Sequence, residues 1–140
     1  MISTVVGRVL HAGIASGRSV VLGEPLSFWG GFDPVTGEVI DRAHPQVGAK
    51  LSERVLVMPG SRGSAGTPGV VAEAIRRGTA PSAFIVTKPD INLTAGAMIA
   101  AALCSIACPV VLVDTAGLGE FVDGAGVEVG EAGSITITTT

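Results

Sequence analysis

The sequence predicts an α/β domain whose mixed sheet is built around a parallel core. Three short apolar runs, at 55–58, 83–86 and 109–113, have the length and composition of buried strands. One helical segment separates the first run from the second, and another separates the second from the third. This alternation implies parallel strands joined by right-handed crossovers, with ligand-binding loops at their carboxyl ends.

Two β-rich flanks are predicted to extend this core with antiparallel strands. Residues 4–22 and 127–140 are punctuated by glycine, and the second flank alternates apolar and polar residues as a half-buried strand does. Between the first flank and the core, residues 26–41 hold the only tryptophan and two of the four phenylalanines among turn-forming residues. This segment is interpreted as a shaped loop, either a satellite hydrophobic cluster or a binding surface.

The two crossover helices are predicted from periodicity. From Val70 to Arg77 the apolar residues fall on one helical face and the charged residues on the other, and Gly78 has the position of a C-cap. The second helix is predicted from about Ala95 to Ala107 and is rich in small residues. Asp90 and Asn92 precede it and are suited to cap or brace its start.

Length and composition indicate a single domain over residues 1–140 that works with a partner. The chain is 47% hydrophobic and 15% charged, so we expect part of its apolar surface to be an interface. The net charge of −3, the scattered basic residues and the scarcity of aromatics argue against nucleic-acid binding. The N-terminal region lacks a signal-peptide core, and Pro109 interrupts the longest apolar stretch. We therefore expect a cytoplasmic protein that does not enter membranes.

The candidate functional site is the glycine loop, Pro59 to Gly69, with the sequence PGSRGSAGTPG. Its four glycines allow the backbone to approach a ligand closely, and the helix that follows directs unpaired N–H groups at that ligand. The loop therefore suits a small, polar, anionic ligand. It has neither the Walker A pattern nor the dinucleotide fingerprint. A purely structural alternative makes Thr67 the N-cap and Pro68 the first helical residue.

Arg62 and Ser64 are the candidate functional side chains of this loop. Arg62 offers a planar fork for a carboxylate, and Ser64 offers a hydroxyl that backbone N–H groups and the helix start can stabilise as an alkoxide. The other acid–base candidates are assigned structural or surface roles: His11, His44, Asp33 and Asp41. Because Ser64 has no evident histidine partner, the pattern suggests half of a shared site and not a hydrolase.

Cys104 and Cys108 are a weak candidate for a metal site. They stand four residues apart at the end of the second predicted helix, where they would share a face. Two thiols without a third ligand seldom hold a metal ion. Buried thiols in a reducing compartment are the preferred interpretation.

Three segments resemble the small subunit, or swivel domain, of the aconitase X family. They are GGFDPVTGEVIDRAHP at 30–45, LSERVLVMPGSRGSAGTPGVVAEAIRRG at 51–78 and TKPDINLTAGAMIAAALCSIACPVVLVD at 87–114, in the order in which the family has them. The resemblance implies the swivelling β/β/α fold of the mobile fourth domain of aconitases. That fold agrees with the predicted mixed sheet and parallel core.

The resemblance also implies roles for the loop residues. In the wider aconitase superfamily, a Gly/Ser-rich loop of this domain presents the serine that removes the proton alpha to a carboxylate. Arg62-Gly63-Ser64 is similar to the aconitase X form of that loop, so Ser64 is implied as the catalytic base. The implied substrate-binding residues are Ser61, Arg62, Gly63, Ala65 and Thr67. Aconitases continue with a second serine and an arginine, where this chain has Ala65 and Gly66, so a substrate with fewer carboxylates than a tricarboxylate is expected.

The activity implied by the resemblance is that of a hydro-lyase subunit that is inactive alone. The glycine loop and PDINLTAGA are closer to bacterial members that dehydrate cis-3-hydroxy-L-proline to Δ1-pyrroline-2-carboxylate, and 5-phosphomevalonate dehydration is the alternative. An iron or iron–sulfur centre is implied on a large subunit, in a heterodimer or larger assembly. No metal ligand is implied in this chain. A non-catalytic anion-binding or regulatory domain is the alternative from another class.

Overall fold

Ten strands and three helices make up the structure, a computed structural model that describes residues 1–140. The strands are β1 (Ile2–Val6), β2 (Arg8–His11), β3 (Ala15–Val21), β4 (Phe32–Asp33), β5 (Glu38–Val39), β6 (Val55–Val57), β7 (Ala83–Val86), β8 (Val110–Leu112), β9 (Gly126–Val129) and β10 (Ser134–Thr138). The helices are α1 (Thr67–Arg77), α2 (Ile91–Cys104) and α3 (Thr115–Leu118). Eight strands form one mixed sheet in the order β1-β10-β9-β3-β6-β7-β8-β2, which confirms the predicted fold class.

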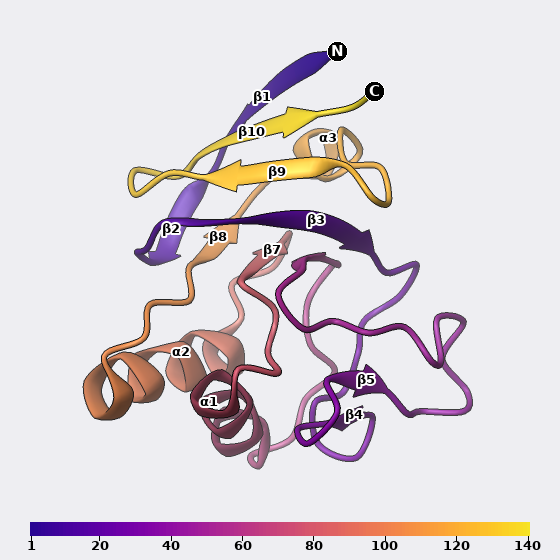
Figure 1. The fold of residues 1–140 in the computed structure, drawn as a ribbon, viewed down its shortest axis with the longest axis vertical. Coiled ribbons are helices and arrows are strands. Elements are labelled where there is room, and N and C mark those ends of the chain that lie inside the picture. Colours follow the sequence, from indigo (N-terminus) through magenta and orange to yellow (C-terminus); the bar gives the residue numbers. More distant parts are fainter.

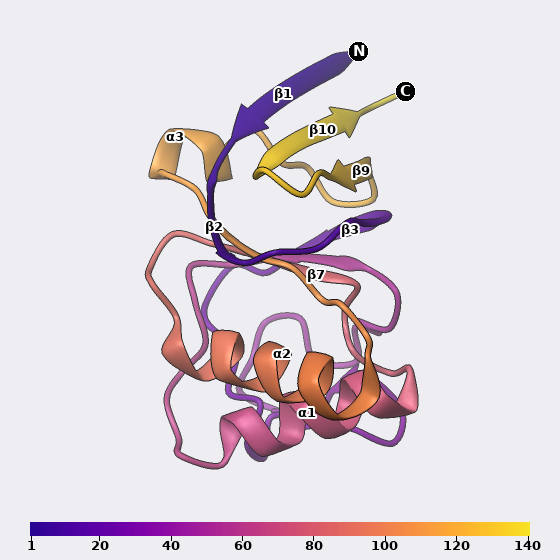
Figure 2. The same cartoon turned by 90° about the vertical axis from the view of Figure 1, so that its left-hand side faces the viewer.

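The sheet folds over on itself, so the molecule has two β layers and a layer formed by α1 and α2 (Figures 1 and 2). β3 links the β layers on one side, because residues 15–18 pair with β9 and residues 19–21 pair with β6. On the other side, β1 pairs with β10 and β2 pairs with β8, with only Gly7 between β1 and β2. A Cβ at Gly7 would collide with Val111 and Leu112, so a glycine is required at this bend.

The parallel core has the predicted topology, and one of its helices has shifted ends. β6, β7 and β8 are parallel neighbours, and α1 and α2 cover the same face of them. Gly78 is the left-handed C-cap of α1, as predicted. The predicted range of α2, Ala95 to Ala107, was wrong at both ends. The Asp90 side chain caps the helix before Ile91, and Ser105, with a φ of 57°, ends it.

Two hydrophobic cores lie on opposite faces of the parallel layer. Because successive strand residues point to opposite faces, Leu56 and Phe84 belong to the core beneath the helices, while Val57 and Ile85 belong to the core between the β layers. All four side chains are fully buried. β6 therefore gives the glycine loop that follows it a rigid base.

The aromatic segment before β4 joins the main core and does not form a satellite cluster. Phe28 and Phe32 are buried with ring centroids 4.9 Å apart, and Phe28 meets Phe84 edge-on at 5.7 Å. Trp29, between the two phenylalanines in sequence, is 62% exposed. The phenylalanines are therefore residues of the main core, and the tryptophan is a surface residue.

Candidate active site

The glycine loop lies at the carboxyl edge of the parallel strands. It leaves the end of β6 and enters α1, and it contacts the segments that follow β3 and β7. In open α/β sheets this edge is where ligands bind. The predicted site residues, Ser61–Ala65 on the loop and Thr67 at the start of α1, therefore lie at the edge where the fold favours a ligand.

Asp90 holds one side of the loop. Its Oδ2 accepts hydrogen bonds from the N–H of Ser61 at 2.6 Å and from the Ser61 hydroxyl at 2.8 Å, while its Oδ1 accepts from the N–H of Leu93 at 3.0 Å. One carboxylate thus caps α2 and fixes the glycine loop. The cap was predicted from the position of Asp90 before a helix, whereas its bonds to Ser61 were not, because they join residues 29 positions apart.

The chain between β3 and β4 holds the other side of the loop. The N–H of Arg62 donates to the carbonyl of Leu26 at 2.9 Å, and Leu26 and Ser61 form an isolated parallel bridge. The Arg62 guanidinium lies 3.4 Å from the carboxylate of Glu24, and both side chains are largely exposed. An exposed pair of this kind contributes little to stability, so the Arg62 side chain is free to turn toward a ligand.

His44 has a structural role beneath this contact. Its side chain is buried, Nδ1 accepts from the N–H of Gln46 at 3.0 Å, and Nε2 lies 3.1 Å from the carbonyl of Glu24. These partners place the proton on Nε2, which donates to Glu24. Both ring nitrogens are thereby engaged with the backbone, so the assignment of His44 as a structural residue agrees with its contacts.

Ser64 lies among backbone N–H groups at the start of α1. Its hydroxyl oxygen accepts from the N–H of Gly66 at 3.2 Å, and its carbonyl accepts from the N–H of Thr67 at 3.1 Å. No hydrogen bond within the chain uses the N–H groups of a further set of residues: Gly63, Ser64, Ala65 and Gly69. Unpaired N–H groups at a helix start attract anions and stabilise developing negative charge.

Thr67 is not the N-cap of α1, the position that the structural alternative gave it. The N-cap is Gly66, without a side-chain cap, and Thr67 is the first residue of α1. The prediction that Thr67 is the N-cap is therefore wrong. The Thr67 side chain is fully buried, and its hydroxyl has no hydrogen-bond partner. Contact between this hydroxyl and a substrate requires the loop to move.

Trp29, in the aromatic segment for which the sequence left open a satellite cluster or a binding surface, is a neighbour of the loop. A Cβ built on Gly66 would lie 2.7 Å from Cε3 and 2.9 Å from Cδ2 of the Trp29 indole. Only glycine permits this approach, so the indole rests directly on the residue whose N–H reaches Ser64. No local pattern predicts the contact, because the two residues are brought together only by the fold.

The thiols do not form a metal site. Cys104 is the last residue of α2 and Cys108 lies beyond the helix, so the prediction that they share a helical face was wrong. Cys108 donates to the carbonyl of Pro81 at 3.5 Å, and burial raises the pKa of its thiol to about 12. The chain has no group of three or more His, Cys, Asp or Glu residues placed to hold a metal ion, so its residues do not fit an iron centre.

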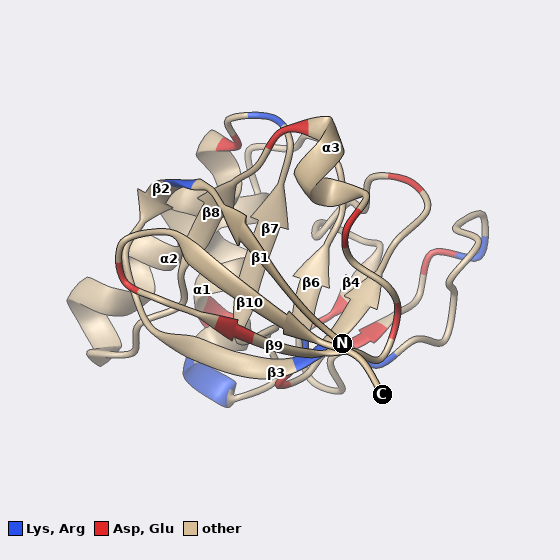
Figure 3. Ribbon diagram, turned by 90° about the horizontal axis from the view of Figure 1, so that it is seen from above, with Lys and Arg blue, Asp and Glu red and all other residues tan.

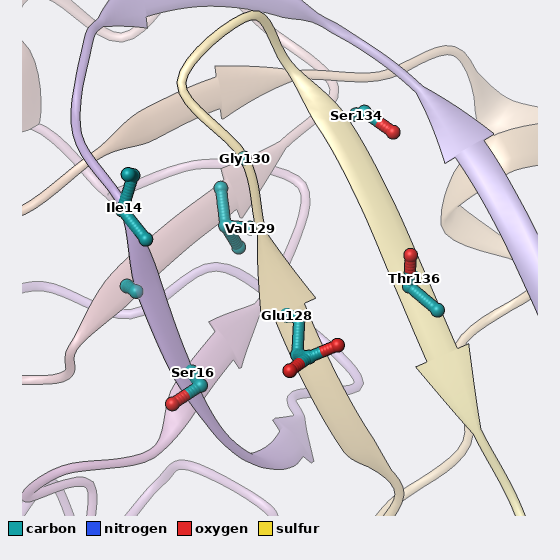
Figure 4. A pocket seen from close by; sticks show the side chains of 8 residues that line it. Ile14, Ser16, Glu128, Val129, Gly130, Ser134 and Thr136 are labelled. Carbon is teal, nitrogen blue, oxygen red and sulfur yellow. The ribbon is translucent and has the colours of Figure 1, made fainter.

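The surface charges and one shallow depression do not point to a second site. Charged residues are few and scattered, without a continuous basic stripe (Figure 3). A shallow depression is lined by Ile14 and Ser16 beside residues of β9 and β10, at the amino end of β3 and so at the opposite edge of the sheet (Figure 4). None of its lining residues belongs to the glycine loop. No helix has the length and apolar composition needed to cross a bilayer.

The layers and the loop together define a swivel-type β/β/α domain that presents a Gly/Ser-rich loop at the carboxyl edge of a parallel sheet. Residues 4–137 match the family model described as the aconitase X swivel domain. The chain belongs to this family.

Relatives of known name fall into two groups. The cis-3-hydroxy-L-proline dehydratase of Pseudomonas aeruginosa is 44% identical over 106 residues, which cover 76% of this chain and 18% of that protein. The phosphomevalonate dehydratase small subunit of Methanopyrus kandleri is 45% identical over 80 residues, which cover 57% of this chain and 59% of that protein. The chain thus spans less than a fifth of the first relative and more than half of the second.

A solved structure has the same fold. The holo-form of Thermococcus kodakaraensis aconitase X includes a chain that superposes with a TM-score of 0.86 at 31% sequence identity. The superposition covers 98% of this chain and 99% of that chain. The predicted swivelling fold is therefore confirmed over nearly the whole length.

Proposed function

We propose that this chain is the small subunit of a hydro-lyase that dehydrates cis-3-hydroxy-L-proline to Δ1-pyrroline-2-carboxylate, with Ser64 as the base. The observation that carries this proposal is the position of the Ser64 hydroxyl, which accepts the N–H of Gly66 at the uncapped start of α1. The unpaired N–H groups around it favour a negatively charged oxygen. A serine without a histidine can act as a base where its alkoxide is stabilised in this way.

The loop performs one half of an elimination. The Ser64 alkoxide takes the proton from the alpha carbon, and the electron pair of that C–H bond forms the double bond to C3. The C3 hydroxyl departs as water with a proton supplied from the large-subunit side of the site, and Ser64 then returns the alpha proton to solvent. The enamine product then tautomerises to Δ1-pyrroline-2-carboxylate. Arg62 and the unpaired N–H groups of the loop hold the substrate carboxylate and stabilise the charge that develops as the alpha proton leaves.

The other half of the reaction belongs to a large subunit. This chain holds no group of residues that fits a metal centre. An iron or iron–sulfur centre of the large subunit would supply Lewis-acid assistance to the leaving group. The chain alone is accordingly inactive, and its loop completes a site at the interface of a heterodimer or larger assembly.

The large subunit is proposed to cover the apolar groove beside Asp90. Leu10, Ile91 and Met98 line this groove, and Asp90 also lines it, so the groove is continuous with the loop that Asp90 fixes. Ile91, the first residue of α2, is 81% exposed, and α2 carries no charged residue. The exposed surface of this helix is therefore largely apolar. The Pseudomonas aeruginosa relative has more than four fifths of its chain outside the matched region, which is ample material for such a partner.

The choice of substrate rests on the comparison of relatives. The match to the hydroxyproline enzyme of Pseudomonas aeruginosa covers 76% of this chain, against 57% for the small subunit from Methanopyrus kandleri. 5-Phosphomevalonate is the second candidate, because the percentage identities of the two matches are nearly equal.

The test is to co-express this chain with the large-subunit reading frame and to follow loss of cis-3-hydroxy-L-proline while trapping the pyrroline product. Turnover that requires both chains is expected. If a well-formed, iron-loaded complex turned over only 5-phosphomevalonate, the proposed substrate would be wrong and the proposed reaction class would stand. Failure of the chains to associate, or inactivity on both substrates, would refute the proposal of a catalytic subunit.

A further inference from the structure

The indole of Trp29 is largely exposed, although the aromatic ring that precedes it in sequence is buried. Its neighbour Phe28 is 1% exposed in the main core, while Trp29 is 62% exposed. A hydrogen bond from the Ser27 hydroxyl to the carbonyl of Trp29, at 2.9 Å, fixes the turn that directs the indole outward. The segment therefore presents its largest aromatic ring to the surface while it buries the smaller one.

The exposed ring is placed beside the proposed base. Its six-membered ring rests on Gly66, where a Cβ would lie 2.7 Å from Cε3 and 3.2 Å from Cζ3. The N–H of the same Gly66 donates to the Ser64 hydroxyl at 3.2 Å. The bridge between Leu26 and Ser61 ties the aromatic segment to the other end of the loop. The ring and the hydroxyl thus flank a single residue, on a loop that is fixed on both sides.

The loop and the Trp29 ring that contacts Gly66 attract opposite charges. The unpaired N–H groups of the loop attract an anion. The face of an indole carries negative electrostatic potential and attracts a cation. A cyclic α-amino acid brings both charges on the same carbon, because its carboxylate and its ring ammonium flank the carbon whose proton is removed. A phosphorylated hydroxy acid offers no cation to the ring.

We propose that Trp29 forms one wall of the Ser64 site and binds the ring ammonium of a cyclic amino-acid substrate, so that it selects such substrates over phosphorylated hydroxy acids. The inference rests on the proposed function for the location of the substrate at Ser64. It adds a specificity-determining residue outside the glycine loop. Its contribution is electrostatic and depends on the aromatic face.

The test compares two unreactive ligands that have the same ring size and different charge. L-Proline carries the ring ammonium, and tetrahydrofuran-2-carboxylate has a neutral ring oxygen in its place. Inhibition constants are measured with the complex of this chain and its large subunit, for the wild type and for Trp29→Leu and Trp29→Phe. Val35→Ala is the control, because Val35 is also 62% exposed and lies between β4 and β5, away from the loop.

We expect Trp29→Leu to weaken L-proline about tenfold and tetrahydrofuran-2-carboxylate less than about twofold. Trp29→Phe should recover most of the difference, because the aromatic face remains. Val35→Ala should leave both inhibition constants unchanged. Equal weakening of the two ligands by Trp29→Leu, or no weakening of either, would overturn the inference.

A second readout separates this inference from the proposed reaction. Because Trp29 is the only tryptophan of the chain, 5-fluorotryptophan incorporated into this subunit alone gives one ¹⁹F resonance in the assembled complex. A shift on addition of L-proline without turnover of cis-3-hydroxy-L-proline would support the Trp29 site and refute the reaction. Turnover without any shift would refute the Trp29 site and leave the reaction standing. A complex with neither turnover nor shift would refute both.

Discussion

The two crossover helices begin in opposite ways, although each follows a buried parallel strand. Asp90 caps α2 with its side chain, and the Thr94 hydroxyl in the first turn donates to the carbonyl of Asp90 at 2.7 Å. α1 begins at Gly66 without a side-chain cap, and the Thr67 hydroxyl has no partner. One helix start is closed by its own chain, and the other is left open. The open start is the one that carries Ser64.

The outer faces of the two helices differ as well. α1 carries Glu73, Arg76 and Arg77, which pair with one another on the surface. α2 carries no charge and exposes large apolar residues, among them Ile91 and Leu103. α1 therefore offers a ligand site at its start and a solvated face, whereas α2 offers a stable start and a face suited to a protein partner.

The largest effect is expected from Ser64→Ala at the open helix start. Loss of the base should lower kcat of the assembled complex by about 10²- to 10⁴-fold, while the affinity for L-proline changes little. Steady-state kinetics and ligand titration measure the two quantities. A non-catalytic anion-binding domain would instead lose only the affinity of one hydrogen bond, about 1 kcal/mol.

Ser61→Ala is the matched control on the same loop. The Ser61 hydroxyl already donates to Asp90 at 2.8 Å, and the backbone N–H of Ser61 keeps its own bond to that carboxylate. We therefore expect a fall in kcat of less than about tenfold, which corresponds to one structural hydrogen bond. A loss as large as that of Ser64→Ala would show that the effect belongs to the loop as a whole and not to the Ser64 hydroxyl.

Asp90→Asn distinguishes the two roles of this carboxylate, which caps α2 and holds the glycine loop. An asparagine Oδ1 can still accept from the N–H of Leu93, but its amide nitrogen cannot accept from Ser61. We expect kcat/KM to fall by about 10- to 100-fold, because the loop loses its fixed position. Chemical denaturation should show a loss of about 1–2 kcal/mol in the free energy of unfolding.

Asp90→Ala completes this test, because it removes the cap as well. The free energy of unfolding should fall by a further amount of about 1 kcal/mol relative to Asp90→Asn. The activity of Asp90→Ala should be close to that of Asp90→Asn, since both lose the bonds to Ser61. If Asp90→Asn kept full activity, the carboxylate would serve only as a helix cap.

The elements that the sequence predicts well are those set by local patterns. Val55–Val57 and Ala83–Val86 are apolar runs bounded by turns, and Gly78 ends an amphipathic helix, so periodicity and capping were sufficient. α2 was misplaced because its residues are apolar on all sides and give no periodic signal. Its ends depend on the cap at Asp90 and the left-handed Ser105.

The part of the site that lies on one continuous segment was predicted, and the part that depends on distant contacts was not. The glycine loop and Ser64 are continuous in sequence, so composition and family resemblance could identify them. Asp90 and Trp29 reach the loop only through the fold, across hydrogen bonds and contacts between distant residues. The burial of Thr67 could not be predicted from a local pattern either. A threonine that directly precedes a proline is typical of an exposed N-cap, whereas the Thr67 side chain is buried.

The two threonines give a smaller test of open and closed helix starts. Thr94→Val removes a hydroxyl bonded to Asp90 at 2.7 Å and should destabilise the chain by about 1 kcal/mol. Thr67→Val removes a buried hydroxyl without a partner and should be neutral or stabilising by up to about 1 kcal/mol. Thermal and chemical denaturation of the free chain measure both. Equal destabilisation by the two variants would mean that the Thr67 hydroxyl has a partner.

The smallest effect is expected on the solvated face of α1. Hydrogen bonds from Arg76 and a smaller contribution from Arg77 hold the pKa of Glu73 at about 2, below the ordinary value of 4.5. The stabilisation by these ion pairs is therefore present above about pH 4.5 and is lost as the pH falls toward about 2. Glu73→Gln should lower the melting temperature slightly near neutral pH, and the difference from wild type should shrink in acid and in high salt. Glu120→Gln is the control, because Glu120 has no ion pair and should show no such dependence. A difference that persists at low pH would trace the effect to packing of the Glu73 side chain and not to its charge.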